Sequence, residues 1–390
     1  MIRTLQLHIP DNIRWDALSV RLFQENAQFF SPAAIEIECD GRTVSIRTDG
    51  PGDESLLLSR LDMLARRIAT SLRDADEAVI FLGGAARSAS HDPMPMLLDR
   101  GEATPNGRGR FISRGRLFTL IAALDEFFGK FALRQGADQA MVGSSIPLSI
   151  LQRTGYLKSF PHHVRFCGRF RREARALESL SGNAAQPDKT GIPWIDELDT
   201  VTEALSPTVC YHCFAANADS VLNRDLLLTA SAVCHRAEHL AREDLSRLEE
   251  FHMREFIAIG TKQTVAQALS AAAEHSVHAF ERWELHFRLA TATDAFFAAS
   301  DVDQAYFQTL LGLKRELSLR MEHSGIWLAV ASFNEHRSSL TDPLNITRDG
   351  KPLKSGCVGW GLERLAYALF AQLGPEMADW PSTVRTDLGL

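Results

Sequence analysis

The sequence has few cysteines and no long apolar run, and both absences narrow the class of protein. Six scattered cysteines in 390 residues are too few for a scaffold held together by disulfides. They are expected as free thiols in a reducing compartment, so the predicted location is cytoplasmic. No uninterrupted apolar stretch of about 18 residues occurs, so no membrane-spanning helix is expected. The segment Met1–His8 lacks the apolar core of a secretory signal.

Two common nucleotide-binding loops are also missing. The chain has no Gly-x-x-x-x-Gly-Lys-Ser/Thr loop, and Gly359 and Gly361 are not followed by the third glycine of a dinucleotide fingerprint. A nicotinamide enzyme is therefore not expected. The charge balance, 42 basic against 49 acidic residues and a net charge of −7, argues against a general nucleic-acid coat.

One local cluster of basic residues stands apart from this acidic balance. It fits either a solvated helix face or a docking site for an acidic partner. The cluster consists of Arg165, Arg169, Arg171, Arg172 and Arg175.

The chain has an ordinary globular composition, with 45% hydrophobic and 23% charged residues, and is long enough for about two domains. Alternating and helical apolar patterns predict a small α+β module over residues 1–82, and a stretch rich in Gly, Ser and Pro over 83–109 is expected as a linker. We therefore expect two domains, 1–110 and 111–390. The predicted strands and helices of the module are 4–9, 14–30, 34–39, 42–48 and 56–72.

The larger part of the chain lacks the regular βαβ rhythm of a parallel sheet. Its strands are expected to bracket helices in an antiparallel α+β arrangement. A strongly apolar helix is predicted over Leu117–Leu133, and the polar stretch Ser179–Asp196 is expected as a loop or insertion.

Two segments carry chemistry-bearing residues. The first, Cys234–Gly260, has two apolar runs around a polar loop, which predicts an antiparallel hairpin with Arg236 and Glu238 on one face. A guanidinium suits a phosphate and the carboxylate suits an adenine amine, although this pair taken alone is better explained as a surface ion pair on a strand. The second segment, Ser355–Phe370, predicts a strand, a glycine turn and an apolar helix with Arg364 in its first turn.

Together these segments resemble motifs 2 and 3 of class II aminoacyl-tRNA synthetases. Motif 1 would be the helix over Leu117–Leu133 and the strand that ends near Pro147. The resemblance covers roughly residues 112–390 and implies a catalytic core with an antiparallel sheet flanked by helices. It also implies a homodimer that pairs through motif 1.

A narrower resemblance is carried by Cys210-Tyr211-His212-Cys213, by Met253-Arg254-Glu255-Phe256 and by Ser355-Gly356-Cys357. These runs look like the zinc-ligand segments of archaeal-type seryl-tRNA synthetases and of their truncated relatives, the amino acid:[carrier protein] ligases. The resemblance implies Zn²⁺ held by Cys210, Glu255 and Cys357, with a fourth position for the amino group of an amino acid. Cys213 remains an alternative to Cys210. Cys39, Cys167 and Cys234 are expected to be small buried residues.

Two runs favour the carrier-protein ligases over the synthetases: the motif 2 segment His235–Thr261, and Ala331–His336 before motif 3. Those ligases usually begin near motif 1, whereas this chain has about 110 upstream residues that resemble a shortened N-terminal domain of the archaeal-type seryl enzymes. Over residues 1–110 there are 13 Arg and Lys against 16 Asp and Glu, a net charge of −3. A domain that grasps tRNA needs a basic face, so tRNA is the less favoured partner.

The resemblance implies ATP-dependent activation of a small amino acid such as glycine, alanine or serine, followed by transfer to the phosphopantetheine thiol of an acidic carrier protein. Charging of a tRNA, or a catalytically inactive paralogue with a binding role, are the alternatives. In the implied roles Arg236 holds the α-phosphate, Glu238 the adenine amine, and Phe251 and Arg364 the adenine ring. Arg247 contacts outer phosphates or the acceptor, and Ser332 and Asn334 lie on the Mg²⁺ side.

Overall fold

The fold is described from a computed structural model of the chain. The structure describes residues 2–30, 34–49, 53–72, 77–85, 91–184, 197–238, 243–294, 296, 308 and 311–390. Among these residues no helix is long and apolar enough to cross a lipid bilayer.

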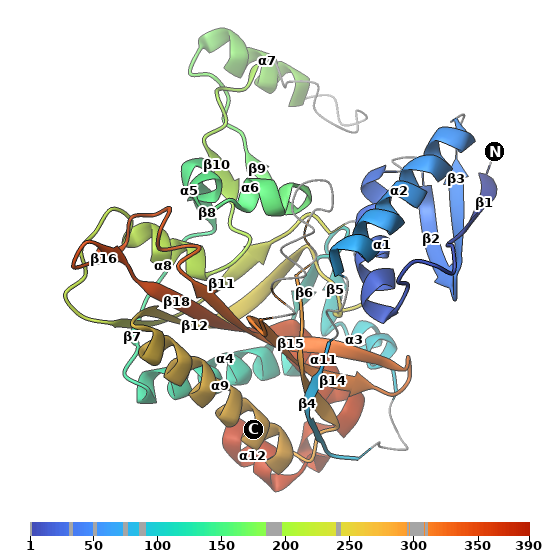
Figure 1. Ribbon diagram of the computed structural model, residues 1–390. Helices are drawn as coiled ribbons and strands as arrows, with labels where there is room; N and C mark the ends of the chain where they lie inside the picture. Colours follow the sequence, from blue (N-terminus) through green and yellow to red (C-terminus); the bar gives the residue numbers. More distant parts are fainter. Residues whose placement is uncertain are drawn as a thin grey trace.

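The centre of the molecule is an eight-stranded sheet (Figure 1). Every neighbouring pair is antiparallel except β7 with β11, so the expected antiparallel α+β core is confirmed. The strands in spatial order are β4 (Val79–Gly83), β13 (Phe287–Thr291), β14 (Lys314–Met321), β15 (Ile326–Arg337), β18 (Lys354–Gly361), β12 (Glu250–Gly260), β11 (Leu226–His235) and β7 (Asp138–Gln139).

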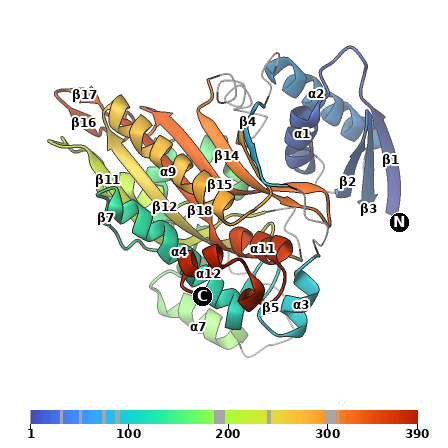
Figure 2. The same cartoon turned by 90° about the horizontal axis from the view of Figure 1, so that it is seen from below.

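Helices cover one face of this sheet and leave the other face for the site. The covering helices are α4 (Gly115–Arg134), α9 (Lys262–Arg282) and α11 (Leu362–Leu373), with α12 (Ser382–Leu388) beside them (Figure 2). The phenylalanines of α4 account for much of this packing. Phe128 stacks on Trp360 at 4.5 Å between ring centroids, and Phe131 stacks on His275 at 4.4 Å. The apolar pattern expected for this helix therefore belongs mainly to the core of its own protomer.

The N-terminal module has its own core and its own sheet. Strands β1 (Ile2–His8), β3 (Thr43–Asp49) and β2 (Ala34–Asp40) pair in that order, and helices α1 (Ala17–Phe30) and α2 (Glu54–Leu72) pack on them. The strands and helices expected from the sequence are confirmed here, with shifts of up to three residues at their ends. The left-handed Gly41, at φ +56°, forms the turn between β2 and β3.

The stretch that was expected as a linker is partly structured. The end of the expected module, Val79–Leu82, forms strand β4 with Gly83 and pairs with β13 at the edge of the large sheet, and within the expected linker α3 (Met94–Asp99) and β5 (Ala103–Pro105) follow. Their apolar side chains, including those of Met94 and Leu97, are buried against the main core, whereas the side chains of a linker would be exposed to solvent. The division into domains at residue 110 stays a prediction.

A narrow arm leaves the body of the molecule between α6 (Tyr156–Ser159) and α8 (Cys210–Ala216). It carries β9 (Phe166–Cys167), β10 (Glu203–Leu205) and, at its tip, α7 (Ala174–Ala184) (Figure 1). Residues 179–184 of the expected polar loop are thus helical, while residues 185–196 lie outside the described part of the chain. Strand β8 (Ser145–Pro147), followed by α5 (Leu148–Arg153), joins the arm to the body.

The remaining elements among the described residues are short. They are β6 (Phe111–Ser113), the 3₁₀ turns η1 (Pro161–His163) and η3 (Met377–Asp379), and the small hairpin of β16 (Thr347–Arg348) and β17 (Lys351–Pro352).

Candidate active site

One large cavity, of about 1090 Å³, lies on the open face of the sheet. All ten residues that the sequence singled out for the site line this cavity, although they come from segments spread over more than 150 residues. They are Cys210, Arg236, Glu238, Arg247, Phe251, Glu255, Ser332, Asn334, Cys357 and Arg364. Their individual roles remain predictions.

The proposed metal ligands form a compact buried group at one end of the cavity. One donor atom from each of Cys210, Glu255 and Cys357 lies within 4.8 Å of the other two. The strands explain this meeting, because Glu255 lies on β12 and Cys357 on the neighbouring β18, while Cys210 begins α8 above them. Two of the backbone amides at that helix start, Val209 N and Cys210 N, donate to the Glu255 carboxylate at 3.0 and 3.1 Å.

The electrostatics of these three residues show a surplus of negative charge. A hydrogen bond from Cys210 and the proximity of His336 hold the pKa of Cys357 well below its usual range. The same bond to Cys357, together with burial, raises the pKa of Cys210, and burial with the Cys357 charge raises the pKa of Glu255 to about 7. A bound divalent cation would neutralise this surplus, and two thiolates with a carboxylate are ligands that Zn²⁺ accepts. The donor set therefore fits zinc.

Cys213 does not join this group among the described residues. It is buried, and burial raises the pKa of its thiol to about 12, as for a thiol packed among apolar neighbours. Cys234 is likewise buried, as expected, whereas Cys39 and Cys167 are only partly buried, contrary to expectation. All six cysteines are free.

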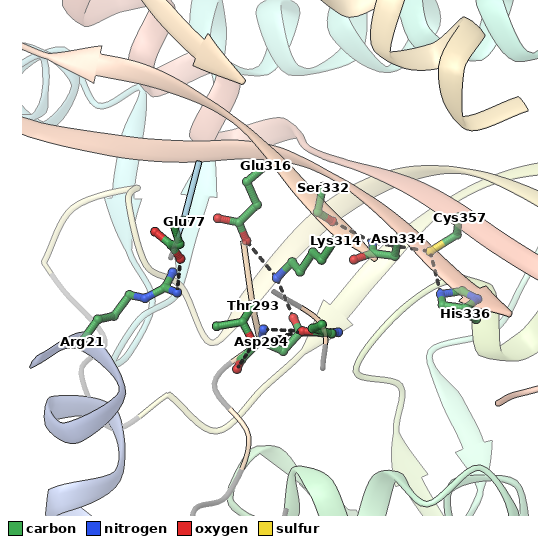
Figure 3. Close-up of polar contacts among 11 residues, drawn as sticks. Arg21, Glu77, Thr293, Asp294, Lys314, Glu316, Ser332, Asn334, His336 and Cys357 are labelled. Carbon is green, nitrogen blue, oxygen red and sulfur yellow. Dashed lines mark hydrogen bonds and ion pairs between the residues drawn. The ribbon is translucent and has the colours of Figure 1, made fainter. Parts of the chain in front are cut away.

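Two groups beside Cys357 were not assigned from the sequence as its neighbours. His336 Nε2 lies 3.6 Å from the Cys357 sulfur, and Asn334 Nδ2 lies 3.8 Å from it (Figure 3). Asn334 Nδ2 also donates to the Ser332 hydroxyl at 3.1 Å. These polar groups can orient the thiolate, and the antiparallel register of β15 on β18 places Asn334 directly opposite Cys357.

The predicted nucleotide end of the cavity begins where β11 ends. Arg236 follows the last residue of that strand, His235, and its guanidinium lies 5.2 Å from the centroid of the Phe251 ring. Its Nε donates to Pro207 O at 3.0 Å. The hairpin of β11 and β12 is confirmed, but Arg236 and Glu238 lie in its loop, just beyond the paired residues.

Glu238 is buried and strongly paired in this state. Its Oε2 accepts a hydrogen bond from Arg247 Nε at 2.6 Å, while its Oε1 lies 4.0 Å from His163 Nε2. Burial alone would raise the pKa of this carboxyl, but Arg247 and His163 outweigh burial and lower it. Glu238 is therefore a charged acceptor with one oxygen less engaged than the other.

Arg364 lies in the first turn of α11, as the sequence predicted. Its Nη1 donates to Ala329 O at 3.2 Å, and burial together with the nearby Arg247 lowers the pKa of its guanidinium. Gly359 on the neighbouring strand has no room for a side chain, since a Cβ there would lie 2.4 Å from the Met253 side chain.

A buried ion-pair cluster in the same cavity was missed by sequence reasoning. Lys314 Nζ lies 2.5 Å from Asp294 Oδ1 and 2.8 Å from Glu316 Oε1 (Figure 3). These two acidic partners raise the pKa of Lys314 against the effect of burial. The Lys-x-Glu spacing on β14 is the only signal in the sequence, and it resembles many exposed strand pairs.

Comparison with solved structures identifies the fold class. The structure matches the M. kandleri seryl-tRNA synthetase solved in complex with A. aeolicus tRNASec, with a TM-score of 0.71 and 18% identity, over 99% of this chain and 77% of that one. The fold is therefore that of class II seryl-tRNA synthetases. No protein-family model matches the chain.

The family follows from the sequence relatives. The chain is 32% and 34% identical to amino acid–[acyl-carrier-protein] ligases 1 and 2 of Bradyrhizobium diazoefficiens, over 62% of its own length and 73% and 71% of theirs. It is 23% identical to the type-2 serine–tRNA ligase of Methanopyrus kandleri, over 91% of its length and 73% of that protein. The chain belongs to the amino acid–[acyl-carrier-protein] ligase family, related to type-2 serine–tRNA ligases, and is a ligase.

Proposed function

We propose that this ligase uses ATP to activate a small amino acid as an aminoacyl-adenylate and passes the aminoacyl group to the phosphopantetheine thiol of a carrier protein. The observation that carries the proposal is the single cavity in which the Cys210–Glu255–Cys357 group lies next to the arginines and the carboxylate of motifs 2 and 3. The nature of the two Bradyrhizobium diazoefficiens relatives supports the choice of acceptor.

In the first half-reaction the amino acid carboxylate attacks the α-phosphorus of ATP and pyrophosphate leaves. Arg236 is proposed to neutralise the α-phosphate, and Phe251 and Arg364, which line the same cavity, are proposed to hold the adenine ring between them. Ser332 and Asn334 are proposed for the Mg²⁺ and phosphate side. These residues contribute position and charge, and no covalent nucleophile from the protein is needed.

Cys210, Glu255 and Cys357 would hold Zn²⁺, which when bound offers its fourth position to the amino group of the substrate. Thr208 keeps the carboxylate of Glu255 in place with a hydrogen bond of 2.7 Å, and Asn334 and His336 flank the Cys357 sulfur. The burial of the three proposed ligands favours a small amino acid such as glycine, alanine or serine. A cytoplasmic location remains a prediction.

The second candidate is a ligase that charges tRNA. It is favoured by the 91% of this chain that aligns with a type-2 serine–tRNA ligase, which includes the N-terminal module. The acidic balance of residues 1–110 speaks against it, because tRNA binding draws on phosphate neutralisation.

The test is ATP–pyrophosphate exchange with each of the twenty amino acids, followed by transfer of radiolabelled amino acid to tRNA and to a holo-carrier protein in parallel. Exchange with a small amino acid and transfer to the thiol are expected. Efficient charging of tRNA with no transfer to any holo-carrier protein would establish the second candidate. Absence of exchange with every amino acid would overturn both.

A further inference from the structure

Helix α1 of the N-terminal module reaches the cavity of the catalytic core. Arg21 and Glu25, one turn apart on this helix, both line the cavity. Their neighbour Asn26 is buried and donates from Nδ2 to Phe296 O at 3.1 Å. The Phe296 ring packs into the core of the module and lies 5.0 Å from that of Phe160, between ring centroids. The module is thus packed against the rim of the active site.

The segment that contains Phe296 is also linked by an ion pair to strand β14, which lines the cavity. Asp294, two residues before Phe296, forms the ion pair with Lys314 on β14, and Lys314 lies opposite Asn334 in the sheet register. Figure 3 shows three separate sets of contacts side by side: Arg21 of α1 with Glu77, Lys314 with Asp294 and Glu316, and Cys357 with Asn334 and His336. The position of α1 is therefore fixed relative to the residues around the predicted substrate site.

Glu25 makes a direct contact with the predicted nucleotide-binding residues. Arg247 Nη1 lies 3.6 Å from Glu25 Oε1, while Arg247 Nε donates to Glu238 Oε2 at 2.6 Å. The side chains of Glu25 and Arg247 are only 18% and 25% exposed. One guanidinium is therefore bracketed by two carboxylates, one from the catalytic loop and one from the N-terminal module.

We propose that Glu25 is a positioning residue for Arg247 in ATP binding, so that the N-terminal module supplies a charged side chain to the nucleotide site. This inference rests on the proposed function, since it takes Glu238 as the acceptor for the adenine amine. With Glu25 in place, Arg247 is drawn toward α1 and binds Glu238 through one oxygen only. The other oxygen is left for the adenine amine.

Loss of the Glu25 charge changes this arrangement. A guanidinium with a single carboxylate partner prefers the bidentate geometry, in which both carboxylate oxygens accept. Arg247 would then occupy both oxygens of Glu238, and ATP would have to displace it. Arg236, the residue proposed for the α-phosphate, contacts Pro207 O and the Phe251 ring rather than Glu25 in the described part of the chain, so the chemical step should change little.

The test is Glu25→Gln in the full-length protein, measured by ATP–pyrophosphate exchange. We expect KM for ATP to rise about tenfold with kcat within about twofold, the pattern of a lost binding interaction. Glu25→Asp, which keeps the charge, should recover much of the difference. The matched control is Glu54→Gln on α2, which removes the exposed ion pair with Arg3 and should leave both constants unchanged.

A pH profile separates positioning from a general structural effect. Burial raises the pKa of Glu25, opposed by Arg247, Arg21 and Lys314, while Glu238 adds to the rise. As pH falls through this raised value, Glu25 takes up a proton and the wild-type protein should behave like Glu25→Gln. The two KM curves for ATP should therefore converge at acid pH and separate toward neutral pH.

The outcomes distinguish the two proposals. Wild-type protein that shows no exchange with any amino acid contradicts the proposed function. Wild-type protein that is active, with a Glu25→Gln variant of equal KM for ATP at neutral pH, contradicts the positioning role alone. A fall in kcat without a change in KM also contradicts it, and a thermal melt of the variant checks that the fold is retained.

Discussion

Arg254 is a buried charge on the helix-covered face of the sheet. The free-energy cost of burying it depends on whether it has an oppositely charged partner. Its Nε and Nη2 donate to the two oxygens of Asp125 on α4 at 2.8 and 2.7 Å, and its side chain is 7% exposed. Both charges are satisfied only as a pair, because a lone guanidinium at this depth would lose its solvation without compensation.

Asp125→Ala should therefore destabilise the protein strongly, by about 3–5 kcal/mol, because it leaves Arg254 unpaired. The neighbouring Glu126→Ala removes only the exposed pair with Lys130, at 2.7 Å, and should cost about 0.5 kcal/mol or less. Denaturant unfolding of both variants measures the difference. Equal losses of stability would show that the buried pair contributes no more to the free energy of unfolding than the exposed pair.

Cys357→Ala should abolish amino acid activation while the fold survives. The variant removes one of three proposed ligands, and elemental analysis should show about one zinc per chain in the wild type and a large loss in the variant. Cys213→Ala is the matched control, since this buried thiol lies outside the group and its variant should keep zinc and exchange activity. Wild-type protein that is active without zinc would contradict the assignment.

At the residue scale the sequence predicted groups that the fold then brings together. Cys210, Glu255 and Cys357 are 45 and 102 residues apart, and the resemblance to known motifs, rather than their spacing, linked them. Glu25, Lys314 and His336 were missed because a single charged residue on a helix or strand carries no local signal. Their significance comes from side-chain contacts across elements, which no pattern along one element encodes.

At the scale of elements, the structure of the arm divides the arginine cluster into two groups. Arg165 pairs with Glu250 at 3.1 Å and Arg169 with Glu203 at 2.7 Å, so these two charges are largely balanced. Arg171, Arg172 and Arg175 are exposed at the start and side of α7, far along the arm. This part of the cluster is the one that suits an acidic carrier protein.

Reversal of charge at Arg171 and Arg172 to glutamate should slow aminoacyl transfer to a holo-carrier protein and leave ATP–pyrophosphate exchange unchanged. Charges at the rim of an interface act mainly on the association rate, and salt screens them. The effect should therefore be large at low ionic strength and shrink as salt is added. Transfer at the wild-type rate in low salt would exclude the arm as the docking surface.

The element types of the module and of α4 were largely predictable because the apolar periodicities of α2, α4 and the module strands are regular. The structured part of residues 83–109 was not predictable, since α3 and β5 are short and their burial depends on contacts with distant residues. The arm was also hidden, because its paired strands have only two or three residues each.

At the scale of the whole molecule, the homodimer stays a prediction. Large apolar side chains remain exposed on and after α4, with Phe118 60%, Leu133 46% and Met141 100% exposed. They lie in the motif 1 region, through which class II cores resembling this one pair. Light scattering at micromolar concentration should give twice the chain mass of 43.3 kDa.

A matched pair of variants tests which surface is used. Phe118→Glu together with Met141→Glu should shift the mass toward that of one chain, because buried charge opposes association. A glutamate at the equally exposed Leu82 on β4, at the other edge of the sheet, should leave the dimer intact. A monomeric wild-type protein would contradict the prediction.

Strand β4 has a consequence for how the chain is made. Its hydrogen-bonding partner, residues 287–291, is synthesised about 200 residues later, and ribosomes add ~5–20 residues per second. For roughly 10–40 seconds, Val79, Ile80 and Leu82 would emerge as an apolar strand without its neighbour. The nascent chain thus passes through a period in which this segment is open to aggregation or to capture by a chaperone, until β13 is made and pairs with β4.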